Sequence, residues 1–163
     1  MLLFFMKNQL IIFDSQFQNL HERSCEIIER TPHEKLFWQP DKIDAPFPSN
    51  SCGEYILQSA GAVEQTFNGI TAKLWDNPFE WTLPEALSSS TLILEYLSEV
   101  EETRRRGFAF FQSDADLSRE LPAPEKLTTI FELLLATSAA AENLQGRALA
   151  IFRLFSDEKL LNR

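Results

Sequence analysis

The stretch KNQLIIFDSQFQNLHERSCEIIER, residues 7–30, carries the pattern that decides the fold. Its apolar side chains recur at steps of three, four and seven residues, at Leu10, Phe13, Phe17, Leu20 and Ile27. This is the spacing of one face of an α-helix, and it does not fit the alternation of a half-buried strand. Pro32 ends the helix, because proline cannot continue the hydrogen-bond ladder and restricts the residue before it.

A long connection follows this first helix. Residues 31–50 contain four prolines and no sustained periodicity, so they are predicted to form a loop anchored by Trp38. A connection of this length permits the first and second helices to run in the same direction. Ser51 and Glu54 then form a capping box, which predicts that the second helix begins there and extends to about Trp75.

Two further helices are predicted in the second half of the chain. The serine cluster at 88–90 offers a hydroxyl cap for a helix that extends to about Phe111. A second capping box, formed by Thr129 and Glu132, opens a last helix that extends to about Phe155. Four such helices predict an all-α fold, a four-helix bundle with a long crossover between helices one and two.

Size and composition agree with one helical domain over residues 1–163. Hydrophobic residues make up 44% of the chain, enough for a single core, and five glycines are too few for a turn-rich β-sandwich or barrel. The formal net charge of -9 repels phosphate backbones and anionic lipid headgroups, which argues against a nucleic-acid or membrane partner. The cluster Arg104-Arg105-Arg106 is interpreted as the basic half of i,i+4 ion pairs on a solvated helix face.

The N-terminus and the cysteines favour a cytoplasmic protein. The first apolar run, residues 1–5, is too short to span a bilayer and lacks the basic region and cleavage site of a secretory signal. Cys25 and Cys52 are the only cysteines, with no C-x-x-C motif and no histidine at metal-ligand spacing. They are predicted to be ordinary buried or half-buried thiols.

Three segments carry a resemblance to a known family. Trp38-Gln39-Pro40 corresponds to a W-x-P element in the first connection, residues 51–58 (SCGEYILQ) resemble an S-x-x-E-L-L-x-H helix start, and residues 133–153 resemble a last helix that carries an H-x-x-x-H pair. In this order and spacing they are similar to the DinB-like superfamily of bacterial helical-bundle proteins. The match covers nearly the whole chain.

In family members with the full pattern, three histidines hold a divalent metal in the bundle core. The resemblance places Gln58 at the histidine of the second helix, and Ala140 and Leu144 at the pair on the last helix. A lone glutamine amide cannot hold zinc, nickel or iron(II), and the two histidines of this chain, His21 and His33, lie elsewhere in the sequence. We therefore expect no metal and no cofactor at these positions.

Two interpretations of these positions remain open. Gln58, Ala140, Asn143 and Leu144 line a small ligand pocket that Trp38 closes, or they are ordinary core residues, with the glutamine satisfied by a backbone carbonyl or a water molecule. A substitute metal site built from helix carboxylates is a weaker third alternative.

The resemblance implies ancestry among metal-dependent transferases of bacillithiol, mycothiol or glutathione. Because the metal stabilises the reacting thiolate, that activity is not expected without its ligands. The first hypothesis is a non-catalytic protein that binds a small molecule or a partner and forms a homodimer, since aromatic residues make up 12% of the chain, more than one core of this size needs. The alternative is a metal-independent thiol transferase or hydrolase that uses Gln58, Asn143 and a tyrosine or cysteine.

Overall fold

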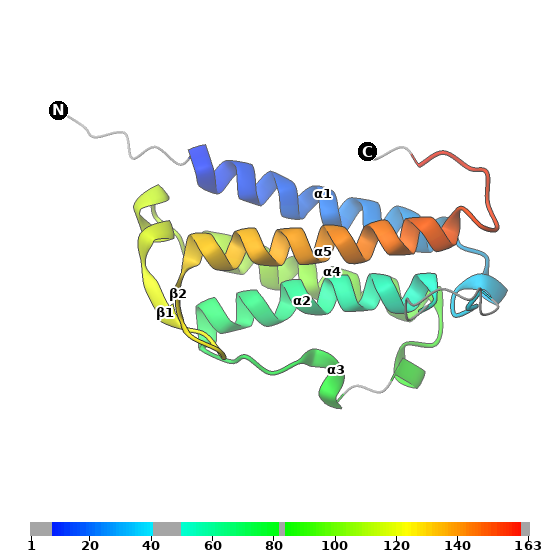
Figure 1. Ribbon diagram of the computed structural model, residues 1–163, viewed down its shortest axis with the longest axis horizontal. Helices are drawn as coiled ribbons and strands as arrows, with labels where there is room; N and C mark the ends of the chain where they lie inside the picture. The colour runs from blue at the N-terminus through cyan, green and yellow to red at the C-terminus, as the bar shows by residue number, and fades with distance from the viewer. Residues whose placement is uncertain (1–7, 41–49, 82–83, 161–163) are drawn as a thin grey trace.

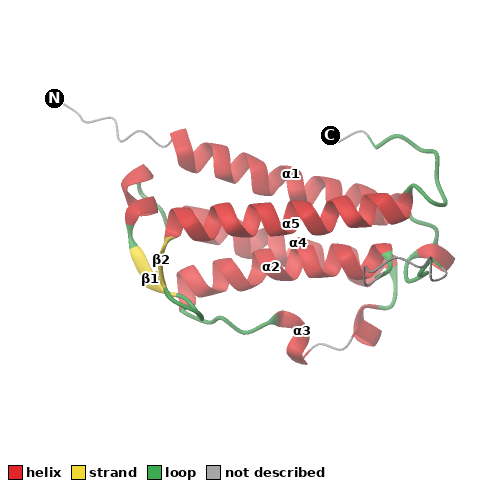
Figure 2. Ribbon diagram, in the orientation of Figure 1, coloured by secondary structure: helices red, strands yellow, loops and turns green. Residues whose placement is uncertain are grey.

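The computed structural model describes residues 8–40, 50–81 and 84–160, and within these it is an all-α four-helix bundle (Figures 1 and 2). The four long helices are α1 (Asn8–Arg30), α2 (Cys52–Ala72), α4 (Ser90–Ala109) and α5 (Ile130–Phe152). The short elements are η1 (His33–Lys35), α3 (Pro78–Trp81), η2 (Pro84–Leu87), η3 (Asp114–Ser118), β1 (Glu120–Pro122) and β2 (Leu127–Thr129). The predicted fold class is confirmed. None of the described helices is both long and apolar enough to cross a membrane.

The four long helices are arranged as two parallel pairs. α1 and α5 run in one direction and α2 and α4 in the other (Figure 1). α2 packs against α5 and α4, and α1 packs against the same two helices. Consecutive helices α1 and α2 are therefore diagonal to each other, and α4 and α5 occupy the other diagonal.

The connection between α1 and α2 is long, as predicted, but it returns to the end of the bundle at which α1 stops. The side chain of Leu36 is fully buried there, and the backbone N–H of Gly53 donates to the carbonyl of Leu36 at 2.8 Å. A β-carbon at position 53 would lie 2.8 Å from that oxygen, so glycine permits the contact. The two helices are antiparallel. It is the connection between the parallel helices α2 and α4, described at residues 73–81 and 84–89, that crosses from one end of the bundle to the other.

The predicted caps start the helices where the sequence places them. In α2 the backbone N–H of Glu54 donates to Ser51 Oγ at 3.2 Å, and the backbone N–H of Ser51 donates to Glu54 Oε2 at 2.7 Å. Thr129 and Glu132 form the same reciprocal pair at the start of α5. Such a cap stabilises a helix by about 1 kcal/mol. The predicted end of α1 at Arg30 is confirmed. The predicted ends of α2, α4 and α5 were two or three residues too late, as at α2, where Lys73 adopts the left-handed conformation with φ of 59°.

A short hairpin before α5 was missed from the sequence, where its prolines indicated only a break. β1 and β2 are antiparallel, with Leu121 opposite Thr128. Next to the hairpin, the carboxylate of Asp114 in η3 accepts hydrogen bonds from the backbone N–H groups of Gln9 and Leu10, at 3.1 and 3.0 Å. This side chain caps the first turn of α1 from a distant part of the sequence.

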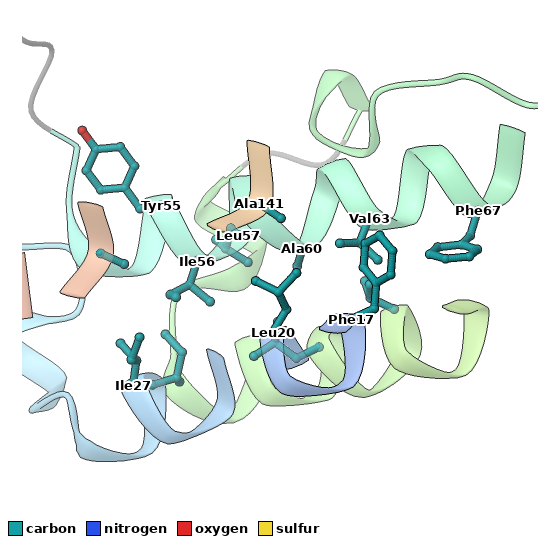
Figure 3. Close-up of a cluster of buried hydrophobic side chains, with 14 of the residues drawn as sticks. Phe17, Leu20, Ile27, Tyr55, Ile56, Leu57, Ala60, Val63, Phe67 and Ala141 are labelled. Atoms are coloured by element: carbon teal, nitrogen blue, oxygen red, sulfur yellow. The ribbon is translucent and has the colours of Figure 1, made fainter. Parts of the chain in front are cut away.

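The core lies where α1, α2 and α4 meet, with α5 closing the remaining side. Figure 3 shows Phe17 of α1 beside Val63 and Phe67 of α2. The rings of Phe17 and Phe67 meet edge to face at 5.3 Å, and Phe108 of α4 lies 5.2 Å from Phe67. Gly107 lets the fully buried Phe67 ring lie against the backbone of α4, since a β-carbon there would be 2.3 Å from the ring.

We predict that Gly107→Ala destabilises the protein by about 1 kcal/mol, although alanine favours helices. The overpacking against Phe67 costs about 1–3 kcal/mol and outweighs a propensity gain of up to about 1 kcal/mol. Ser98→Ala on the exposed side of the same helix is the control, because it raises helix propensity without a new core contact, and it should gain up to about 0.5 kcal/mol. Urea unfolding measures both, and equal stabilisation of the two variants would contradict the packing described here.

Candidate functional site

The residues predicted to line an interior pocket lie on the outside of the α2–α5 pair. Gln58, Ala140 and Asn143 are exposed, and Leu144 is half-buried against the core. The hydroxyl of Ser59 donates to the carbonyl of Ala141 at 3.0 Å, so Gln58 and Ala140 lie at the same level of this pair. Their role in binding stays a prediction, but it now concerns a surface and not a cavity.

Trp38 does not close a pocket over these residues. It lies at the end of the bundle, half-buried, with its ring edge to face with Phe155 at 6.1 Å. The amine of Lys35 lies 4.5 Å from the centre of the indole. Phe155 comes about three helical turns after Leu144, so Trp38 packs well away from the α2–α5 level that contains Gln58.

The side chains that do point inward lie one residue further along each helix, at Ser59, Ala141 and Gln145. Gln145 is 1% exposed, and its amide nitrogen donates to the carbonyl of Leu20 and the hydroxyl of Ser24, both at 2.8 Å. Buried positions of α5 recur at helical spacing, as at 134, 141, 145, 148 and 152, and they include Ala141 and Gln145. Gln58, Ala140 and Leu144, the positions that the resemblance assigns, each lie one residue before these inward-facing side chains.

The interior space beside these groups is too small for an organic ligand. A cavity of about 20 Å³ lies between α1, α2 and α4. Apolar side chains line it together with His21, Ser24, Ser59, Glu101 and Arg104. A single water molecule needs about 10–15 Å³ on this measure. The core of the bundle therefore accommodates about one water molecule and no substrate.

Arg104 turns inward from the basic cluster and forms a buried ion pair. It is 4% exposed, and its guanidinium donates to both carboxylate oxygens of Glu101, at 2.8 and 2.7 Å. A third guanidinium hydrogen bond reaches the carboxylate of Asp14 on α1. Arg105 donates to Glu101 at 2.9 Å from the exposed side, which confirms the i,i+4 pairing. The prediction of a solvated face holds for Arg105 and Arg106 but is wrong for Arg104.

The surroundings of this ion pair shift the pKa values of Glu101 and His21. Burial alone would raise the pKa of Glu101, but the hydrogen bonds and positive charge of Arg104 outweigh it and hold this pKa below 4.5. Burial lowers the pKa of the neighbouring His21, which favours its neutral form. The arrangement stabilises the packing of α1 on α4.

We predict that Glu101→Gln destabilises the protein at pH 7 by about 3 kcal/mol, because it leaves the buried Arg104 charge short of a partner. Since the pKa of Glu101 is lower in the folded than in the unfolded chain, its contribution is complete above pH 4.5 and is lost on acidification. The difference between wild type and variant should thus shrink below that pH in urea titrations. Glu102→Gln, its exposed neighbour, should change stability by less than about 0.5 kcal/mol.

The thiols are held in their unreactive form. Burial raises the pKa of Cys25 and of Cys52 to about 11. Cys25 lies 3.7 Å from His21 Nε2, but the imidazole does not offset the burial and the nearby acidic charges. Tyr96 donates to Glu64 Oε2 at 2.6 Å, and burial together with this carboxylate raises its pKa as well. None of these groups is an activated nucleophile.

We predict that iodoacetamide alkylates the folded protein at pH 7.5 at least about a hundredfold more slowly than a short cysteine peptide. A pKa of about 11 leaves a thiolate fraction a few hundredfold smaller than that of a free cysteine, and burial of Cys52 adds a steric barrier. Mass spectrometry of samples quenched over time gives both rates. A thiol as reactive as the peptide would revive the thiol-enzyme alternative.

The three carboxylates that could form a substitute metal site each bind a different partner. Glu54 completes the α2 capping box, Glu64 accepts from Tyr96, and Glu142 binds Arg23 at 3.0 Å. Within residues 8–40, 50–81 and 84–160, no group of three or more histidine, cysteine, aspartate or glutamate side chains is placed to hold a metal ion.

A larger hollow lies on the surface between α2, α3, η2 and α4, which we call the α3–α4 hollow. It has a volume of about 330 Å³. Its lining comprises Glu64, Pro78, Phe79, Leu87, Leu92, Glu95, Tyr96 and Glu99. Sequence reasoning missed it, because its walls come from separate segments and the aromatic residues between α2 and α4 showed no periodic pattern.

The outer side of α5 is rich in small and apolar residues and carries fewer charges than the outer side of α4. Its exposed residues, which we call the α5 face, are Phe131, Glu132, Leu135, Ala136, Ala139, Ala140, Asn143, Gly146, Arg147 and Ala150. Only Glu132 and Arg147 among them are charged. The exposed side of α4, by contrast, carries five charged residues, Glu95, Glu99, Glu102, Arg105 and Arg106.

Comparison with known proteins adds no relative: no family model, no curated protein and no solved structure matches the chain. The resemblance to the DinB-like superfamily therefore remains a prediction from the sequence. The functional argument rests on the surfaces and side chains described above.

Proposed function

We propose that this chain is a non-catalytic interaction protein that pairs with a second copy of itself through the α5 face. The observation that carries the proposal is the apolar, small-residue character of that face on a chain with a net charge of -9. Two such acidic chains repel each other over most of their surfaces, but least where charges are few. Two of the residues predicted to bind, Ala140 and Asn143, belong to the α5 face.

Small side chains on this face favour a helix–helix contact. Alanines and a glycine let two helix backbones approach closely, and exposed Leu135 and Phe131 supply apolar area, being 53% and 39% exposed. Most dimers of identical chains have two-fold symmetry, in which the same surface meets itself. A second α5 is therefore the partner whose shape this face fits.

The two charges on the face complement each other in an antiparallel pair. Glu132 and Arg147 lie about 22 Å apart along the helix, and the midpoint between them falls between Ala139 and Ala140. A two-fold axis at that midpoint brings Arg147 of each copy opposite Glu132 of the other. Arg147 forms no ion pair with any residue that the structure describes within its own chain.

The alternative, a metal-independent thiol transferase or hydrolase, has less support. Gln58 and Asn143 are exposed on the α2–α5 surface, whereas the thiols have pKa values raised to about 11. A nucleophile needs a neighbouring base or a lowered pKa. The DinB-like ancestry, if it applies, would supply a scaffold here and not a reaction.

We predict that the protein is a dimer at micromolar concentration and that Ala140→Glu raises the dimer dissociation constant at least about tenfold. The substitution places two like charges and extra volume beside the two-fold axis. Sedimentation equilibrium measures the constant for both proteins. Ala109→Glu, an exposed alanine on α4, is the matched control and should dimerise like wild type. A monomeric wild type, or equal loss in both variants, would refute the proposal.

A further inference from the structure

The α3–α4 hollow is a formed site with an aromatic wall. Phe79 lies against α2 at Gly61, where a β-carbon would come within 2.5 Å of its ring. The same ring meets Tyr96 of α4 edge to face at 5.7 Å. Contacts with two helices thus hold the wall in place. The volume of about 330 Å³ falls at the lower end of the range for small-molecule pockets.

The charged side chains around this wall are all negative. Glu64, Glu95 and Glu99 line the hollow, and no lysine, arginine or histidine is among its described lining residues. Glu95 and Glu99 are exposed one helical turn apart on α4, and Glu64 holds the hydroxyl of Tyr96. The adjoining surface toward the other end of α4 shares Glu64 and Glu99 with the hollow, but Arg105 and Arg106 also line it.

This combination selects one class of ligand. An aromatic and aliphatic surface accepts an apolar body, and the negative faces of Phe79 and Tyr96 also attract a cation. Three carboxylates without a neutralising base favour a positive charge and repel an anion. A neutral apolar molecule would gain only the first of these contributions.

We propose that the α3–α4 hollow binds a small organic ammonium ion, with its apolar body on Phe79 and Tyr96 and its charge toward Glu95 and Glu99. This site is independent of the α5 face, since α4 and α5 occupy opposite corners of the bundle. A failure of either proposal leaves the other unaffected.

The probe for this site is phenethylammonium, compared with 2-phenylethanol and 3-phenylpropanoate, which have similar apolar bodies but no positive charge. Amide chemical shifts in ¹⁵N-labelled full-length protein at pH 7 follow the titrations. We expect the cation to bind with a dissociation constant of about 0.1–1 mM, with shifts at Phe79 and Tyr96, and the other two probes to bind at least about tenfold more weakly. No shift at about 10 mM, or equal binding of all three probes, overturns the proposal.

A pair of double variants tests the role of the carboxylates. Glu95→Gln with Glu99→Gln removes two charges from the hollow and should raise the dissociation constant at least about fivefold. Glu22→Gln with Glu29→Gln makes the same change in net charge on α1 and should leave it within about twofold. Circular dichroism confirms that both variants are folded. An equal loss in the two variants would mean attraction by net charge alone and would refute a specific site.

Discussion

Close coverage of α2 is the constraint on which the rest of the structure depends. This helix packs against α4 and α5, and aromatic rings from the connection after it lie on its remaining side. Phe79 lies on Gly61 and Trp75 lies on Gly69, where a β-carbon would come within 2.3 Å of the indole. To place both rings, the chain must run back along α2 before α4 begins, and α4 is therefore parallel to α2.

The same constraint leaves α5 uncovered on its outer side. The connection that follows α2 covers that helix. The short hairpin before α5 stays at one end of the bundle and covers no helix along its length (Figure 1). Nothing that the structure describes lies over Ala136, Ala140 and Asn143. The coverage of α2 and the exposed outer side of α5 thus have one topological cause, and the two proposed binding surfaces lie at opposite corners of the bundle.

The sequence predicted the elements better than it predicted their surroundings. Caps and periodicity are local, so the starts of α2 and α5 at Ser51 and Thr129 followed directly from side chains within one turn. The direction of α2 and the inward turn of Arg104 depend on partners far away in the chain, the carbonyl of Leu36 and the carboxylate of Asp14. Gln58 and Ala140 lie on the surface, one residue before the inward-facing Ser59 and Ala141, because one residue moves a helical side chain about 100° around the axis.

The cap that Asp114 places on α1 also bears on how the chain assembles during synthesis. Domains begin to form as the chain emerges from the ribosome, N-terminus first. The backbone donors Gln9 and Leu10 lie in the first turn of α1, whereas their acceptor Asp114 is made only after three of the long helices. When α1 has just been made, the backbone N–H groups of its first turn therefore lack the carboxylate that caps them. Its neighbours α4 and α5 have also not been synthesised, so the nascent first half of this protein has no bundle to join.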